Sequence, residues 1–156
     1  MTTERKNELE VIKSLIGNPT AALQRLSALC NVAAYLNSIL KEINWVGFYI
    51  VGEDKRLHVG PFQGKVACSE LEWNKGVCAT AWRSKKSVVV DDVSKFEGHI
   101  ACDSESKSEL VVPIINNDKV VAVLDVDSPL LNNFTISDVN FLEKVGQLVS
   151  ELFSFS

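Results

Sequence analysis

Three of the four cysteines lie where a thiol can react. Cys68 and Cys102 fall in two long predicted loops, and Cys78 falls in the first turn of a short predicted helix that begins at Gly76. A helix N-terminus favours the thiolate, which is the reactive form of cysteine. A cysteine that is oxidised during a reaction also needs a second thiol within reach to form a disulfide. Each thiol alone is more often a packed one, but the three together indicate redox chemistry.

The remaining cysteine and a histidine suggest other uses. Cys30 lies on the apolar stripe of a predicted helix, so we expect a buried, small hydrophobic residue. His99 and Cys102 have the spacing of a zinc-ligand pair, and Cys68 and Cys78 would complete a set of four. However, nine residues separate Cys68 from Cys78 and the chain has no CxxC pair. The spacing therefore favours redox chemistry over zinc.

Three carboxylates lie at the ends of predicted strands in the C-terminal half of the chain. Asp125 and Asp127 stand two apart at the end of a buried strand, so both side chains point to one side of the sheet. Asp125 has apolar neighbours and should be buried, whereas Asp127 alone could face solvent. A buried carboxylate is costly unless it pairs with a cation or stays protonated. A ligand ammonium or a proton-donor role would satisfy both aspartates. Glu109 could face the same cavity, although alone it suggests a solvated strand start.

Trp45 and Tyr49 are four residues apart on one predicted strand and therefore share a face. Such a pair usually belongs to the core, but it could also form one wall of a pocket for an apolar or cationic ligand. Residues 60–65 resemble a phosphate-binding loop at first sight. One residue is missing between the glycines, and Val66 stands where Ser or Thr would bind magnesium. No nucleotide cofactor is therefore expected.

These side chains must be positioned by the helices and strands that the sequence predicts. Together, the predicted elements indicate an α+β domain with a mostly antiparallel sheet covered by helices. An amphipathic helix ends around Gly17, and Asn18-Pro19 is predicted to start a longer one that reaches about Lys41. Thr135 and Asp138 predict the capped start of the last helix. The remaining predicted segments are strands at 45–51, 56–60, 87–90, 110–115 and 120–126, a helix at 76–85, and long loops at 61–74 and 91–107.

The composition excludes several other classes of protein. The 156 residues suit a single domain over 1–156, with 46% hydrophobic and 23% charged residues. A net charge of −4 disfavours a nucleic-acid or anionic-membrane partner. The polar N-terminus and the short apolar runs predict no signal peptide and no membrane span. A cytoplasmic protein with free or redox-active thiols is therefore expected.

The chemistry-bearing residues lie within motifs of a known family. The chain resembles the free methionine-(R)-sulfoxide reductases, which are stand-alone GAF-domain enzymes. The resemblance runs from about Asn44 to Pro129 and rests on these motifs: NWVGFY (44–49), GPFQGKVAC (60–68), KGVC (75–78), GHIACDS (98–104), SELVVPI (108–114) and VLDVDSP (123–129).

This resemblance implies a GAF fold, a central antiparallel sheet of about six strands with helices packed on its faces. It also implies that free methionine (R)-sulfoxide is reduced to methionine, that thioredoxin recycles the enzyme, and that no metal or organic cofactor is required. GAF domains often pair, so a homodimer stays open. A non-catalytic GAF sensor for a small ligand and a zinc-stabilised interaction module are the alternatives. The site residues implied are the nucleophile Cys102, the resolving Cys68, the auxiliary thiol Cys78, the substrate-binding or acid-assisting Glu109, Asp125 and Asp127, and the pocket aromatics Trp45 and Tyr49.

Overall fold

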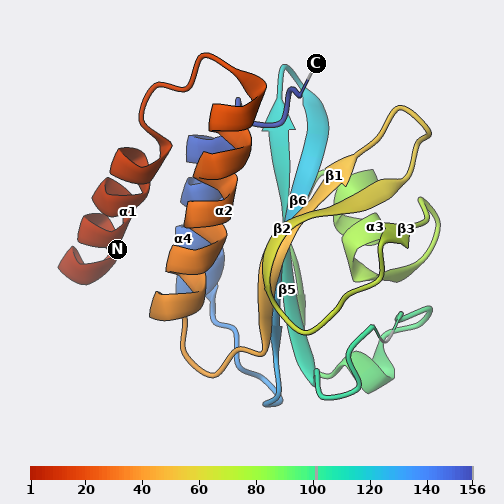
Figure 1. Ribbon diagram of the computed structural model, residues 1–156. Coiled ribbons are helices and arrows are strands. Elements are labelled where there is room, and N and C mark those ends of the chain that lie inside the picture. Colours follow the sequence, from red (N-terminus) through yellow and green to blue (C-terminus); the bar gives the residue numbers. More distant parts are fainter. Residues whose placement is uncertain (101, 156) are drawn as a thin grey trace.

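A six-stranded antiparallel sheet forms the centre of the molecule in a computed structural model that describes residues 1–100 and 102–155 (Figure 1). Its strands lie in the order β3-β2-β1-β6-β5-β4. The predicted α+β architecture with about six strands is confirmed. The strands are β1 (Trp45–Val51), β2 (Leu57–Gly64), β3 (Glu70–Leu71), β4 (Val88–Val90), β5 (Ser108–Asn116) and β6 (Lys119–Ser128).

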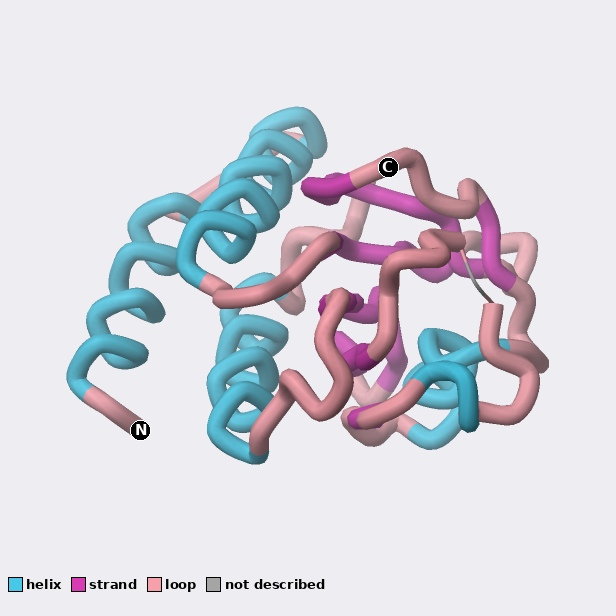
Figure 2. The backbone as a smooth tube through the Cα atoms, turned by 90° about the horizontal axis from the view of Figure 1, so that it is seen from below, coloured by secondary structure: helices cyan, strands magenta, loops and turns pink. Residues whose placement is uncertain are grey.

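Helices cover the two faces of the sheet unequally. The long helices α1 (Thr3–Ile16), α2 (Ala22–Ile39) and α4 (Ile136–Val149) gather on one face, while α3 (Gly76–Ser84) and the short 3-10 helix η1 (Val93–Lys95) lie on the other (Figures 1 and 2). Within the described ranges, none of the helices is both long and apolar enough to span a membrane.

Strand alternation divides the apolar side chains into two clusters. Phe48 and Leu124 belong to the cluster beneath the three long helices. Their strand neighbours Tyr49 and Val123 belong to the cluster beneath α3. Successive side chains of a strand point to opposite faces. Asp125 and Asp127 therefore lie on the α3 side of β6, as do Trp45 and Tyr49 on β1.

The start of α4 confirms the predicted cap. The Thr135 hydroxyl accepts a hydrogen bond from the Asp138 backbone N–H at 3.4 Å, and an Asp138 carboxylate oxygen accepts one from the Thr135 N–H at 2.8 Å. This reciprocal pair is a capping box, which satisfies two helix-end donors at once.

The predicted start of α2 is wrong. The helix begins at Ala22 rather than at Pro19, because Gln24 in its first turn caps the later position. The Gln24 side-chain oxygen accepts hydrogen bonds from the backbone N–H groups of Thr20 (2.8 Å) and Ala21 (3.1 Å). These bonds satisfy donors that the helix itself leaves free.

The burial expected for Cys30 is also wrong. The buried face of α2 is made by Ala28, Leu29, Val32, Ala33 and Leu36, and Cys30 is exposed. An α-helix turns by about 100° per residue, so the neighbour of a fully buried Leu29 can face away from the core. Cys30 is therefore remote from the α3 face of the sheet.

The predicted loop over residues 61–74 is partly strand. β2 continues to Gly64, and β3 pairs with it at Glu70 and Leu71. Pro61 lies inside β2, where a proline normally breaks the ladder. The pairing of β1 with β2 shifts between Gly47 and Tyr49, which creates an irregularity opposite Phe48. Pro61 is tolerated because it falls at that irregularity, where a regular ladder donor is not needed.

Candidate active site

A cavity of about 50 Å³ lies on the α3 face of the sheet. It collects side chains from β1, β5, β6, α3 and the segment before β5, which are far apart in the sequence. Every site residue expected from the sequence lines this cavity except Cys68, which is bonded to a residue that does. The lining residues among them are Trp45, Tyr49, Cys78, Cys102, Glu109, Asp125 and Asp127.

Sheet register explains why the carboxylates and aromatic rings meet. Glu109 on β5 is paired with Asp127 on β6, and Asp127 is paired in turn with Trp45 on β1. The three residues form one row across adjacent strands. Asp125 and Tyr49 lie further along β6 and β1 on the same face of the sheet. Because cross-strand neighbours on one face lie about 5 Å apart, this row forms a continuous cavity wall.

A disulfide joins the two long loops. Cys68 and Cys102, 34 positions apart in the chain, are bonded with their Cα atoms 5.6 Å apart. Cys78 remains a free, buried thiol. The proximity of two loop cysteines that the redox interpretation requires is therefore present. The zinc set of His99, Cys68, Cys78 and Cys102 is not available in this state, because two of its thiols are bonded to each other.

Hydrogen bonds anchor both cysteine loops to β1. The Tyr49 hydroxyl donates to the Cys68 carbonyl at 3.0 Å. The Asn44 side-chain amide donates to a carboxylate oxygen of Asp103 and to the Ser106 hydroxyl, each at 3.0 Å. Cys102 is thus followed by a turn that is tied to the first residue before β1.

An ion pair also links the two loops directly. The Lys65 ammonium lies 2.9 Å from a Glu105 carboxylate oxygen. Asn44 and Lys65 thus hold the two cysteine loops, and neither residue was predicted to belong to the site. The sequence could have pointed to these two residues, because both lie inside the motifs that carry the family resemblance.

The carboxyl groups are buried together. Glu109 and Asp125 are almost inaccessible to solvent, so the solvated strand start that Glu109 suggested by itself is wrong. Burial raises the pKa of Glu109, of Asp125 and of Asp127 well above the ordinary value, and the neighbouring carboxylates of the cluster raise each pKa further. This environment favours the protonated form of the carboxyls, which is the form that can donate a proton.

Cys78 differs from its expected behaviour. Its position at the start of α3 predicted a stabilised thiolate, but burial, followed by the charge of Asp125, raises the pKa of its thiol well above the ordinary value. The desolvation of the thiolate and the nearby negative charges therefore outweigh the helix end. Cys78 is a protonated thiol in this state.

No permanent cation neutralises the cluster within the described part of the chain. Among the described residues, the one ion-pair geometry that involves Glu109, Asp125 or Asp127 is between His99 Nε2 and Glu109 Oε1, at 3.6 Å. Burial lowers the pKa of His99, which favours its neutral form. Asp125 Oδ1 is buried without a hydrogen-bond partner. The cavity can therefore accept a cationic or hydrogen-bond-donating group of a ligand.

Stacked aromatic rings continue the same cavity wall on β1, where Trp45 and Tyr49 line the cavity. Trp45 stacks on Tyr49, with ring centroids 5.7 Å apart, and on Phe62, with centroids 5.1 Å apart. The Trp45 indole N–H donates to the Lys65 carbonyl at 3.2 Å. Burial, followed by the charge of Asp125, raises the pKa of Tyr49, so its hydroxyl stays neutral. Phe62 was not expected, since residues 61–74 were predicted to be loop.

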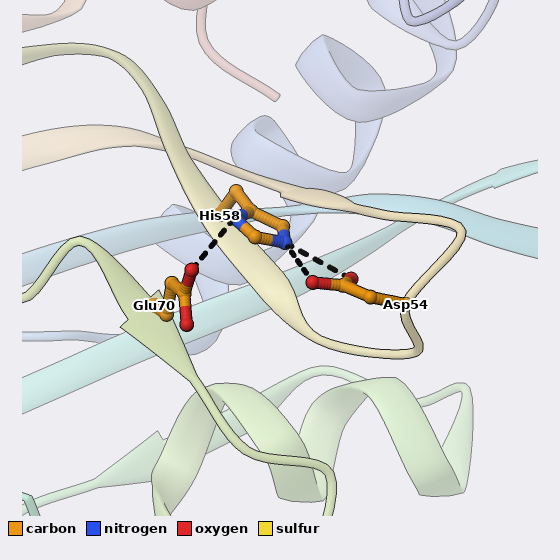
Figure 3. A group of neighbouring side chains, drawn as sticks. All are labelled: Asp54, His58 and Glu70. Carbon is orange, nitrogen blue, oxygen red and sulfur yellow. Dashed lines mark hydrogen bonds and ion pairs between the residues drawn. The ribbon is translucent and has the colours of Figure 1, made fainter.

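A second cluster of possible ligands lies on the surface, outside the cavity lining. His58 Nε2 lies 2.8 Å from Asp54 Oδ2, and His58 Nδ1 lies 3.7 Å from Glu70 Oε1 (Figure 3). Arg56 also lies 3.5 Å from Glu70. The histidine directs its two ring nitrogens to different carboxylates. This cluster is an exposed ion-pair network that joins the β1–β2 turn to β3.

Comparison with known proteins identifies the family of this chain. Residues 27–154 match the GAF domain family. The free methionine-R-sulfoxide reductase of Saccharomyces cerevisiae is 49% identical over 117 residues, which are 73% of this chain and 65% of that protein. The Escherichia coli protein of the same name is 43% identical over 127 residues, which are 81% of this chain and 74% of that protein. The chain belongs to the free methionine-(R)-sulfoxide reductase family. Its predicted GAF fold is confirmed.

A solved structure extends the similarity of this reductase-family chain to three dimensions. The free methionine-R-sulfoxide reductase of Neisseria meningitidis, determined in complex with its substrate, superposes with a TM-score of 0.88 at 35% identity. The match covers 96% of this chain and 87% of the Neisseria chain. The GAF fold of this family member therefore extends over nearly its whole length.

Proposed function

We propose that this protein reduces free methionine (R)-sulfoxide to methionine, with Cys102 as nucleophile and Cys68 as resolving cysteine. The observation that carries the proposal is the disulfide between these residues at the edge of a cavity lined by buried carboxyl groups. The family membership supports the same reaction, since two relatives bear the name of this reductase.

In the proposed reaction the sulfoxide oxygen passes from the substrate to Cys102. The S–O bond of the sulfoxide is hard to break until its oxygen is protonated, so attack by the Cys102 thiolate requires a nearby acid. A protonated carboxyl of Glu109, Asp125 or Asp127 supplies that proton. Methionine then leaves with the electron pair, and Cys102 becomes a sulfenic acid.

A second thiol closes the proposed cycle. The Cys68 thiol attacks the sulfenic sulfur of Cys102, which forms the disulfide and releases water. Thioredoxin, a dithiol protein, then reduces the disulfide by exchange, so that two electrons and two protons enter for each methionine formed. Cys78 is an auxiliary thiol that can also form a disulfide, and full recycling in a Cys68 variant would assign the resolving role to Cys78 instead. The reducing cytoplasm is the compartment that suits this exchange.

Substrate selectivity follows from the charge of the cavity. A free amino acid carries an ammonium group, which a carboxylate of the cluster would bind in place of the missing protein cation. A peptide-bound methionine sulfoxide has an amide at that position and no charge, so it would leave a buried carboxylate unpaired. Trp45 and Tyr49 would pack against the apolar part of the side chain.

The decisive experiment follows NADPH oxidation coupled through thioredoxin and thioredoxin reductase. Free R-sulfoxide should be turned over, whereas free S-sulfoxide and a peptide-bound sulfoxide should not. Cys102→Ser should abolish the reaction, and Cys68→Ser should leave a single reductive turnover without recycling. Cys30→Ser is the matched control, because Cys30 is exposed on α2. Binding of the free R form without any turnover would instead indicate a non-catalytic sensor.

A further inference from the structure

The free thiol of the cavity, Cys78, lies beside two of the buried acids. None of the proposed steps depends on this contact between the thiol and the acids. Cys78 Sγ and one carboxylate oxygen each of Glu109 and Asp125 all lie within 4.8 Å of one another. The three residues are 4%, 7% and 5% exposed, so the group is buried. It stays available while Cys68 and Cys102 are bonded to each other.

One atom of this group has no partner. Asp125 Oδ1 is buried without a hydrogen bond, and Asp125 lines the cavity. Lys75 also lines the cavity, but its ammonium lies 3.9 Å from Glu72 instead. A buried, unpartnered carboxylate oxygen is costly and therefore marks a place where a cation or donor is favoured.

From this arrangement we infer that Cys78, Glu109 and Asp125 form a binding site for a thiophilic divalent cation, Zn²⁺ or Cd²⁺, in the oxidised protein. A thiolate ligand selects such ions over Mg²⁺ and Ca²⁺, which prefer oxygen ligands alone. Three protein ligands with water in the fourth position is the common arrangement of zinc sites that keep an open coordination position.

The distances fit such an ion after small side-chain rotations. Zinc bonds of about 2.0–2.3 Å place the ligand atoms of a tetrahedral site about 3.5 Å apart. The cavity of about 50 Å³ has room for an ion and a water. His99, 3.6 Å from Glu109, is placed to orient that carboxylate or to replace the water.

Binding requires that the ion replace the protons of the three groups, which it releases to solvent. No electron transfer is involved, so the site does not depend on the proposed reductase activity. An ion bound there would occupy the space assigned to the substrate ammonium, and it would therefore compete with the substrate if that assignment is correct.

The test uses the oxidised protein, freed of added thiols, and measures Zn²⁺ affinity by competition with a chromogenic chelator. One equivalent should bind, and Cys78→Ser should weaken binding by at least about tenfold, the loss typical of removing even a residue that only orients a metal ligand. Asp125→Asn should do the same. With Cd²⁺, the ultraviolet thiolate-to-metal absorption should arise in the parent protein and in Cys30→Ser, but not in Cys78→Ser.

The surface cluster of Figure 3 provides the competing outcome. His58→Ala should leave the affinity and the Cd²⁺ absorption unchanged. Loss of binding in His58→Ala would overturn the inference and place the metal on the surface. An unchanged affinity in Cys78→Ser would overturn it as well, because the thiol would then not be a ligand. The Cd²⁺ absorption keeps the test decisive if Asp125→Asn does not fold, since it requires only the parent protein and the two cysteine variants.

Discussion

Glu109, Asp125 and Asp127 obtain their properties from one another and from burial. A single carboxyl at a strand end would be solvated and ionised at neutral pH. Here the sheet register and the apolar surroundings raise the pKa of all three residues together. The same three groups can therefore donate a proton or bind a cation, depending on how many protons the cluster holds.

Asp125 should make the fold less stable as the pH rises. Its folded pKa is raised above the unfolded value of about 3.9, so between these two values the native state holds more protons than the unfolded chain. The free energy of unfolding therefore falls as the pH rises through this window. Asp125→Asn removes this contribution, so the decrease in stability as the pH rises above about 4 should be smaller.

Urea denaturation at several pH values measures this difference. Asp118→Asn is the matched control, because Asp118 is exposed in the turn between β5 and β6. A pH dependence that is equally steep in Asp125→Asn and in the parent protein would contradict the raised pKa of Asp125.

Tyr49 connects the aromatic wall to the disulfide. Tyr49→Phe keeps the stacked ring but removes the hydroxyl that donates to the Cys68 carbonyl. We expect a loss of about 1 kcal/mol in the free energy of unfolding. Urea denaturation of the oxidised protein checks this value. Tyr35→Phe is the control, since no hydrogen bond of its hydroxyl is found within the described residues, and an equal loss in both variants would contradict the assignment.

At the scale of elements, a regular sheet supports two irregular loops. β1, β5 and β6 carry the carboxyls and the rings, whereas both bonded cysteines lie outside helices and strands. Loops need anchors if their reactive groups are to meet at a fixed distance. Asn44 supplies one such anchor through Asp103 and Ser106, and Lys65 supplies another through Glu105.

Asn44→Ala should slow closure of the disulfide. Without the two amide hydrogen bonds, the turn after Cys102 samples more positions, and misplacement by about 1 Å can cost about a hundredfold in rate. We expect disulfide formation to slow by about tenfold or more. The measurement treats reduced protein with one equivalent of hydrogen peroxide, blocks free thiols at set times and follows the masses. Asn37→Ala on the exposed side of α2 should match the parent protein.

The cap of α4 provides a contrasting prediction on the other face. Thr135→Ala removes one half of the capping box and should cost about 1 kcal/mol of stability. Because α4 lies on the face of the sheet away from the cavity, disulfide closure well below the unfolding temperature should be unchanged. Urea denaturation and the peroxide assay separate the two effects, and a slower closure would show that the faces are not independent.

At the scale of the whole molecule, the two faces of the sheet differ in what they contain. The face covered by α1, α2 and α4 buries the larger apolar cluster, and the face covered by α3 holds the acids and thiols. Buried acids and a buried thiol cost stability unless they are satisfied. The apolar cluster on the opposite face offsets that cost.

The disulfide should stabilise the whole chain in its oxidised form. A link between residues 34 positions apart restricts the unfolded state, which is worth about 3–4 kcal/mol in the chain-entropy account. Reduction should therefore lower the urea midpoint without a loss of structure at zero urea. Far-ultraviolet circular dichroism of both forms measures this, and an equal midpoint in the reduced and oxidised protein would contradict the expectation.

Local patterns were sufficient for much of this architecture. Alternation along a strand is a property of the backbone, so it correctly predicted that Trp45 shares a face with Tyr49 and that Asp125 shares one with Asp127. The cap of α4 depends on Thr135 and Asp138 alone and was equally predictable. The roles of these side chains in a reaction stay predictions.

Tertiary structure decided what depends on distant neighbours. The burial of Glu109, the exposure of Cys30 and the protonated state of Cys78 follow from which surfaces pack against each residue, and local sequence does not contain that information. The β2 irregularity that admits Pro61 likewise arises only from pairing with β1. The sequence by itself determined the side-chain types and the faces they share. Only the folded sheet decided their distances and protonation, because both depend on long-range packing and desolvation.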